Sequence, residues 1–243
     1  MIKKHIPNFI TLLNLFSGSV AIVFAFEGNL MLASWFIGFA AVFDFMDGMA
    51  ARLLNARSEI GVQLDSLADL ISFGLAPGVI VYQLMNTTVS PPFLYFNGIN
   101  VFALLAFIIP AFSALRLAKF NIDESQTSSF IGLPTPANAL FFASLPLVVF
   151  QADELANTWI LYLSNNYWVL AGITILFSLL MVSNIHLFSL KLKNFKFREN
   201  LSRYALLFLS LALIIFLKYY AFPLIVLSYI LISLIENTSS AKR

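Results

Sequence analysis

Long apolar segments, separated by short polar breaks, make up most of this chain. Most of these segments approach the roughly 20 residues that a helix needs to cross about 30 Å of hydrocarbon. Backbone polar groups inside a bilayer must be bonded within their own segment, so we expect each segment to form a helix. The pattern predicts an all-α, polytopic membrane bundle with helices at approximately 8–26, 31–54, 62–85, 99–119, 134–150, 167–190, 204–219 and 222–237.

The composition supports a membrane location. Of the 243 residues, 60% are hydrophobic and only 11% are charged, so the chain is not an ordinary soluble domain. We interpret the first apolar segment as a membrane helix and not as a removed signal peptide, because no convincing cleavage site of small residues follows it. The net charge of +2 is too small to indicate a nucleic-acid partner, and the lack of cysteine excludes thiol chemistry.

Basic residues are distributed unevenly between the two ends of the expected helices. If eight helices alternate in direction, Lys218 alone falls on one side. Basic residues concentrate on the cytoplasmic side of membrane proteins, so we expect a multi-pass protein of the cell membrane with both termini in the cytoplasm. The cytoplasmic set comprises Lys3, Lys4, Arg52, Arg57, Arg116, Lys119, Lys191, Lys193, Lys196, Arg198, Arg203, Lys242 and Arg243.

The stretch from Asp44 to Asp69 places four carboxylates in mostly apolar surroundings. The other acidic residues lie in polar connectors or at the ends of apolar segments. Asp44 and Asp47 are three residues apart, and Asp65 and Asp69 are four apart, so each pair shares one face of a helix. Because a short connector joins the two halves, the pairs can turn towards each other at the cytoplasmic ends of the second and third helices.

Carboxylates gathered in this way need a counter-charge. They repel one another, most strongly where water is partly excluded, and Mg²⁺ or Mn²⁺ is the type of ion that carboxylate and water ligands bind. Gly48 and Ala51 share the face of Asp44, and Gly61 shares that of Asp65, which leaves room above the acids, and we expect these three small residues to contact the substrate. Two other interpretations stay open: a solvated loop between helices, or the ion site of a cation-coupled transporter. The absence of an internal sequence repeat disfavours the transporter.

The spacing D-x2-D-G-x2-A-R-x8-G-x3-D-x3-D, which runs from Asp44 to Asp69, resembles the signature of the CDP-alcohol phosphotransferase family. The resemblance implies a single membrane domain over residues 1–243, with a six-helix catalytic core over about 1–190 and an additional helical hairpin over about 204–237. It also implies a homodimer and two divalent ions held by the four aspartates. By the same resemblance, the last acid of the motif, Asp69, is the general base.

Three further segments are similar to the family members that make phosphatidylserine: P-N-F-I-T-L-L-N-L-F-S-G near the N-terminus, R-L-A-K-F-N at Arg116 and G-L-P-T-P-A at Gly132. This resemblance implies CDP-diacylglycerol and L-serine as substrates, within a surround of membrane lipids. A family member that uses glycerol phosphate or an inositol compound is the alternative. Such an acceptor would need extra cationic residues at the site, and the sequence offers few.

Several other polar residues are candidates for substrate contacts. Asn8 and Thr11 lie on a polar stripe of the first helix, where they either pack against neighbouring helices or line the nucleotide pocket. Arg52 and Arg116 would hold phosphate or the serine carboxylate, because the guanidinium fork matches both groups. Arg116 has a second interpretation, in which it extends to lipid headgroups. We interpret the basic cluster at 191–198 as an anchor on anionic lipid, with a phosphate contact by Lys191 as the alternative.

Overall fold

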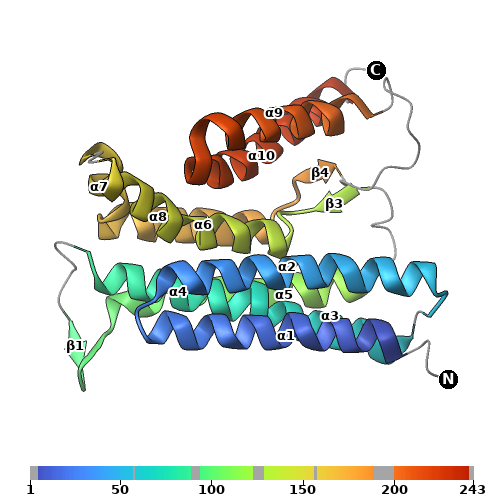
Figure 1. Cartoon of the computed structure of the whole chain (residues 1–243), viewed down its shortest axis with the longest axis horizontal. Helices are drawn as coiled ribbons and strands as arrows, with labels where there is room; N and C mark the ends of the chain where they lie inside the picture. Colours follow the sequence, from blue (N-terminus) through green and yellow to red (C-terminus); the bar gives the residue numbers. More distant parts are fainter. Residues whose placement is uncertain are drawn as a thin grey trace.

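A computed structural model of the chain describes residues 5–56, 58–88, 94–122, 129–155, 158–188 and 200–240. Within these ranges the protein is a helical bundle, with two short pairs of antiparallel strands at its ends (Figure 1). The helices are α1 (His5–Phe26), α2 (Leu30–Leu53), α3 (Glu59–Asp69), α4 (Ala76–Asn86), α5 (Ile108–Ile122), α6 (Thr135–Glu154), α7 (Thr158–Ser164), α8 (Tyr167–Val182), α9 (Leu201–Leu217) and α10 (Ala221–Ser240). The strands are β1 (Tyr95–Phe96), β2 (Ile99–Asn100), β3 (Ser129–Ile131) and β4 (His186–Phe188).

The predicted all-α membrane bundle is confirmed. Among the described residues, six helical runs are long and apolar enough to cross a membrane. The last of these runs turns back on itself at the 3₁₀ segment Lys218–Tyr220, which separates α9 from α10. The helix expected over 167–190 is shorter than predicted, because α8 ends at Val182 and the chain continues into β4.

The third predicted helix is not a regular α-helix along its whole length. A π-helical segment, Leu70–Leu75, connects α3 to α4 and begins directly after Asp69. The middle of this segment, Ser72 to Gly74, is buried. Short π-helical insertions are rare and often occur at functional sites, because they change the direction in which neighbouring side chains point. The apolar pattern alone predicted an uninterrupted helix here.

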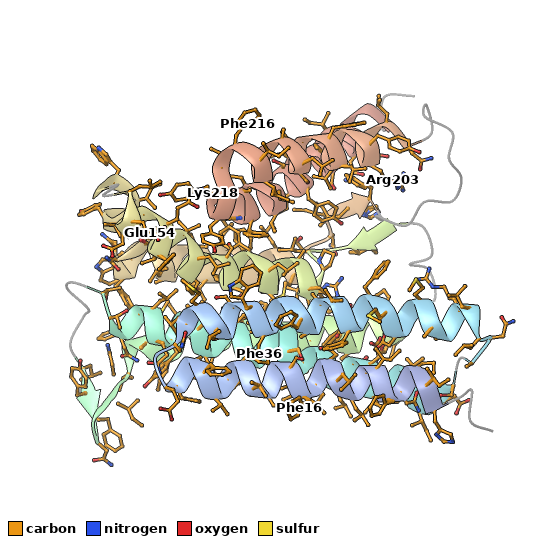
Figure 2. The ribbon with its side chains drawn as sticks, viewed as in Figure 1. Phe16, Phe36, Glu154, Arg203, Phe216 and Lys218 are labelled. Carbon is orange, nitrogen blue, oxygen red and sulfur yellow. The ribbon has the colours of Figure 1, made fainter. Side chains whose placement is uncertain are left out.

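The bundle has an apolar outer surface and an interior rich in small residues. Phe16 on α1 and Phe216 on α9 point away from the bundle and are 64% and 82% exposed (Figure 2). Small side chains in the interior let helix backbones approach closely, as is typical of packing between membrane helices. Buried alanines include Ala21, Ala25, Ala33, Ala40, Ala68, Ala76, Ala103 and Ala106.

The helix order brings several chain segments to one end of the bundle. In Figure 1, α1 begins, α2 ends, α3 begins, α5 ends and α6 begins on the right-hand side. Among the described basic residues, Arg203 lies at this end and Lys218 at the other (Figure 2). The predicted members of the cytoplasmic set that lie outside the described residues are Lys3, Lys4, Arg57, Lys191, Lys193, Lys196, Arg198, Lys242 and Arg243.

The C-terminal hairpin of α9 and α10 is attached to the bundle at both of its ends. At the turn, Gln151 of α6 donates to the carbonyl of Leu217 (3.3 Å) and accepts from the backbone N–H of Tyr219 (2.7 Å). Midway along α10, the Tyr229 hydroxyl donates to the Phe188 carbonyl of β4 (3.0 Å), and nearer the other end Asn237 donates to the His186 carbonyl. The hairpin therefore covers α6 and holds β4, which pairs with β3 just before α6 begins.

Substitution of Gly18 is expected to disturb the closest approach between α1 and the π-helical segment. A Cβ at this position would lie 2.6 Å from the Cα of Ser72, well inside the roughly 3.5–4.0 Å at which carbon atoms pack. We expect Gly18→Ala to destabilise the fold by about 1–3 kcal/mol, measured as a lower melting temperature in detergent. Gly38→Ala on α2 is the matched control, because a Cβ there meets no atom within 4 Å. Equal melting temperatures for the two variants would contradict this packing.

Candidate active site

Three aspartates from two helices converge at one end of the bundle. Asp44 and Asp47 lie on α2 and Asp65 lies on α3, and each offers a carboxylate oxygen within 4.8 Å of those of the other two. Asp47 is 6% exposed, while Asp44 and Asp65 are half-buried. Two buried oxygens, Oδ2 of Asp47 and Oδ1 of Asp65, have no hydrogen-bond partner among the described residues. Three carboxylates this close, two of which keep an unbonded buried oxygen, suit a divalent cation as their common partner.

The local sequence between the helices explains how the acids meet. The helix α2 ends at Leu53, and Asn55 adopts a left-handed conformation (φ 48°), which asparagine tolerates better than most residues. The side chain of Ser58 then caps α3 by accepting a hydrogen bond from the N–H of Gly61 (3.1 Å). This short reversal turns the acidic face of α3 towards that of α2.

Asp69 lies one helical turn beyond Asp65 and belongs to a different set of contacts. It is 8% exposed, and its Oδ1 accepts a hydrogen bond from the Nδ2 of Asn14 on α1 (3.2 Å). The Ser72 hydroxyl donates to the backbone carbonyl of Asn14 (2.9 Å), which ties α1 to the π-helical segment. Asn14 and Ser72 were not predicted as site residues, although both belong to polar stripes that the sequence shows. The metal-ligand role predicted for Asp69 stays a prediction.

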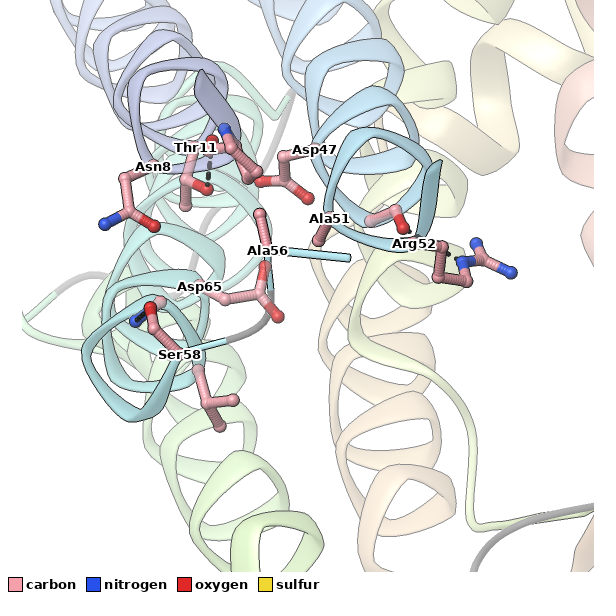
Figure 3. A pocket seen from close by; sticks show the side chains of 12 residues that line it. Asn8, Thr11, Asp47, Ala51, Arg52, Ala56, Ser58 and Asp65 are labelled. Atoms are coloured by element: carbon pink, nitrogen blue, oxygen red, sulfur yellow. Dashed lines mark hydrogen bonds between the residues drawn. The ribbon is translucent and has the colours of Figure 1, made fainter. Parts of the chain in front are cut away.

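A cavity of about 290 Å³ opens beside Asp47 and Asp65. Figure 3 shows both carboxylates pointing into this cavity from opposite helices. Six of the seven predicted substrate-binding residues line it: Asn8, Thr11, Gly48, Ala51, Arg52 and Gly61. Asn8 and Thr11 thus line a cavity, although Thr11 is 3% exposed and its hydroxyl also donates to the Pro7 carbonyl (3.0 Å). Their role in substrate binding stays a prediction. We call this space the first cavity.

Small residues at the first cavity keep its walls open. A Cβ at Gly61 would lie 3.0 Å from the Ser58 hydroxyl and 3.1 Å from Oδ1 of Asn8, so only glycine leaves these two groups in place. Arg52 is directed away from Asp47 and Asp65 in Figure 3, and its Nε donates to the Gly48 carbonyl (2.9 Å). A phosphate contact by Arg52 would thus be made at the rim of the cavity and not at its centre.

Arg116 lies apart from the first cavity. It lines a second cavity of about 430 Å³, formed by the end of α5, by Ile131 and by the end of α8. Its side chain is 6% exposed, which argues against the interpretation that it extends to lipid headgroups. The guanidinium lies within range of charge interaction with Asp69, and its Nε has no partner among the described residues. The second cavity therefore presents a buried cation on the side of Asp69 that α5 covers.

Comparison with known proteins identifies this arrangement. The sequence model of the CDP-alcohol phosphatidyltransferase family matches residues 4–180, which include all four aspartates, the lining of the first cavity and Arg116. The chain belongs to this family. A membrane transferase is therefore the class of this protein, and the family assignment overrides the interpretations as a solvated loop or a transporter site. The hairpin of α9 and α10 lies outside the matched residues.

The chain is similar to bacterial and yeast proteins named CDP-diacylglycerol–serine O-phosphatidyltransferase. One from Helicobacter pylori (strain ATCC 700392 / 26695) is 35% identical over 211 residues, covering 86% of this chain and 80% of the relative. One from Bacillus subtilis (strain 168) is 41% identical over 146 residues, covering 60% and 75%. One from Saccharomyces cerevisiae is 33% identical over 184 residues, covering 64% and 63%.

Proposed function

We propose that this protein is a CDP-diacylglycerol–serine O-phosphatidyltransferase. The observation that carries the proposal is the convergence of Asp44, Asp47 and Asp65 beside the first cavity, in a chain similar to relatives of that name. The serine hydroxyl forms a bond to the phosphorus on the lipid side of the diphosphate. The bond from that phosphorus to the CMP oxygen breaks, which releases CMP and leaves phosphatidylserine in the membrane.

The three clustered aspartates, with Asp69 as a candidate fourth ligand, would hold two divalent ions, either Mg²⁺ or Mn²⁺. The buried oxygens of Asp47 and Asp65 support this assignment, because no group among the described residues donates a hydrogen bond to them. When bound, such ions neutralise the diphosphate and stabilise the charge on the departing CMP.

The protein's own residues position the substrates around these acids. Gly48 and Ala51 leave space for the nucleotide to lie against α2, and Asn8 and Thr11 supply polar contacts from α1. Asp69, the last acid of the motif, accepts the proton of the serine hydroxyl, and the Asn14 amide that bonds its Oδ1 holds it in position. Arg116, which lines the second cavity and interacts with the charge of Asp69, binds the serine carboxylate.

We further infer that the site and both termini face the cytoplasm, because the basic residues of the sequence concentrate at that end. This orientation gives water-borne serine and CMP access to the aspartates, while the acyl chains of the donor lie in the bilayer. A homodimer is the assembly that the family resemblance implies. Its formation is testable by the molecular mass of the purified protein in detergent.

The proposal predicts CMP release that depends on both serine and metal. Purified protein with CDP-diacylglycerol and Mg²⁺ or Mn²⁺ is expected to release CMP with L-serine and not with glycerol 3-phosphate or inositol compounds. EDTA is expected to abolish the release, and added Mg²⁺ or Mn²⁺ to restore it. Release of CMP with a different alcohol would leave the proposed metal site standing but would show that serine is not the acceptor. Release that EDTA does not affect would contradict the metal site.

A further inference from the structure

Buried polar atoms without partners gather on α6 and α8. Thr135, Asn138 and Ser178, which we call the buried triad, are 1%, 0% and 0% exposed. The hydroxyls of Thr135 and Ser178 and both amide atoms of Asn138 have no hydrogen-bond partner within the described parts of the chain. Polar groups buried in this way cost free energy unless something bonds to them. Four such atoms on adjacent helices therefore indicate a missing polar occupant.

One contact just before α6 and one within it join this part of the chain to α8, and the buried triad lies between the two. The N–H of Leu133 donates to the carbonyl of Leu180 (3.0 Å), which fixes the start of α6 beside the end of α8. Further into the bundle, the rings of Phe141 and Phe177 stack at 4.0 Å. All three triad residues fall between these contacts along their helices, so they occupy the same short interval of the α6–α8 interface. The stacked rings close this interval on the side away from the aspartates.

Arg116 on α5 lies beside the same end of α8 as the buried triad. Ser113 on α5 donates to the sulfur of Met181 (3.6 Å), one helical turn beyond Ser178 on α8. Met181 and Arg116 both line the second cavity, together with Lys119 nearer the surface. On its other flank, α6 packs against the π-helical segment that follows Asp69. The buried triad is therefore placed between the cation of the second cavity and the helix that carries the proposed base.

We propose that the buried triad and Arg116 form the binding site for the acceptor amino acid, and this inference rests on the proposed function. The acceptor carboxylate binds the guanidinium of Arg116, whose fork geometry matches it. The acceptor ammonium donates to Oδ1 of Asn138 and to the hydroxyls of Thr135 and Ser178, which are neutral acceptors. The hydroxyl of the acceptor is left pointing towards Asp69.

This arrangement explains selection of a zwitterion over a phosphorylated alcohol. A phosphorylated alcohol has no ammonium, so the acceptor oxygens of Asn138, Thr135 and Ser178 would lack the charged donor that the ammonium of serine supplies. A site built to bond a polar group of its substrate rejects analogues that lack the group, because its own buried atoms are then left unpaired. The buried triad should therefore select acceptors that carry an ammonium, and Arg116 should select acceptors that carry a carboxylate.

Steady-state kinetics with three acceptors test the assignment. L-Serine carries both charges, 3-hydroxypropanoate lacks the ammonium, and ethanolamine lacks the carboxylate. We expect Asn138→Leu, which keeps the side-chain size, to raise the KM for serine about tenfold or more, since bonds to charged groups are among the stronger ones. The preference for serine over 3-hydroxypropanoate should fall by a similar factor. The KM for CDP-diacylglycerol and the preference for serine over ethanolamine should stay within about twofold.

A matched control lies on the same helix. Ser144 is also buried, but its hydroxyl already donates to the Phe141 carbonyl (2.6 Å), so Ser144→Ala should leave the KM for serine unchanged. Ser178→Ala, which removes a single oxygen, gives a second measurement should Asn138→Leu fail to fold. An unchanged KM for serine in both triad variants overturns the inference and assigns the buried triad to bound water. If Asn138→Leu lost the preference for serine over ethanolamine, Asn138 would contact the carboxylate, and the assignment of the ammonium to the buried triad would be wrong.

Failure of the proposed function would look different. In that case the wild-type protein forms no phosphatidylserine from L-serine, before any variant is compared. If the wild type forms phosphatidylserine and the triad variants behave like Ser144→Ala, the proposed function stands and the inference about the acceptor site falls.

Discussion

Replacing Asp69 by asparagine is expected to lower turnover by roughly 10²–10⁴-fold, the usual contribution of a general base. An amide of the same shape cannot accept the proton of the attacking hydroxyl. It can still fill the space next to Asn14, whose amide bonds the carboxylate in the native protein (3.2 Å). Because the three clustered aspartates are untouched, we expect the affinity for CDP-diacylglycerol to change by only a few fold. Single-turnover kinetics and lipid binding, measured on the same sample, separate the two quantities.

Glu59→Gln is the matched control for the loss of a carboxylate. Glu59 lies on the same helix, α3, but it is exposed at the first turn and lines neither cavity. Its variant should turn over at the wild-type rate. Near-normal turnover by Asp69→Asn would show that another group accepts the proton. An equal loss of lipid binding and turnover would instead assign Asp69 to the metal site alone.

Replacing Asp47 or Asp65 by asparagine is expected to lower turnover about a thousandfold and to weaken metal and CDP-diacylglycerol binding together. Charge stabilisation by a catalytic metal amounts to several kcal/mol, and each 1.36 kcal/mol is a factor of ten in rate. The two residues supply unpaired buried oxygens from opposite helices, so neither loss can be compensated by the other. Titration of Mn²⁺ into each variant, followed by electron paramagnetic resonance, measures the metal affinity directly.

Without bound metal, the same two substitutions should not lower the thermal stability of the protein. Three carboxylates within 4.8 Å of one another repel in partly buried surroundings, and neutralising one removes part of that repulsion. We therefore expect Asp47→Asn and Asp65→Asn to melt at the wild-type temperature or above it in EDTA, and to gain less stability than the wild type when Mg²⁺ is added. A lower melting temperature in EDTA would mean that these carboxylates are structural partners of protein groups and not metal ligands.

The family, the membrane bundle and the acidic site followed from local patterns in the chain. Apolar segments of membrane-spanning length indicate the helices directly, because a bilayer leaves the backbone few alternatives. Asp44 and Asp47, and likewise Asp65 and Asp69, have spacings that place each pair on one helix face whatever else the chain does. Eight of the twelve residues that line the first cavity were predicted for the same reason, since they lie on the same short stretch or on the first helix.

Contacts between distant segments decided the remaining features. Asn14 and Asp69 are 55 residues apart, and nothing in either local pattern specifies that α1 presents one to the other. The π-helical segment after Asp69 has the same apolar pattern as an ordinary helix, so periodicity could not reveal it. Arg116 was predicted to hold a substrate, but its position in a second cavity depends on how α5 packs against α8.

The buried triad is the feature that the sequence alone could least predict. Asn138 and Ser178 have the residue types of ordinary packing positions in membrane helices, and Thr135 stood out in the sequence only as part of the segment that begins at Gly132. Their importance lies in what they do not contact, and that can be judged only when all neighbouring side chains are in place. Helix faces are local properties, set by the 3.6-residue repeat of a single segment. Which faces meet, and which polar atoms they leave without partners, is settled by the packing of whole helices against one another.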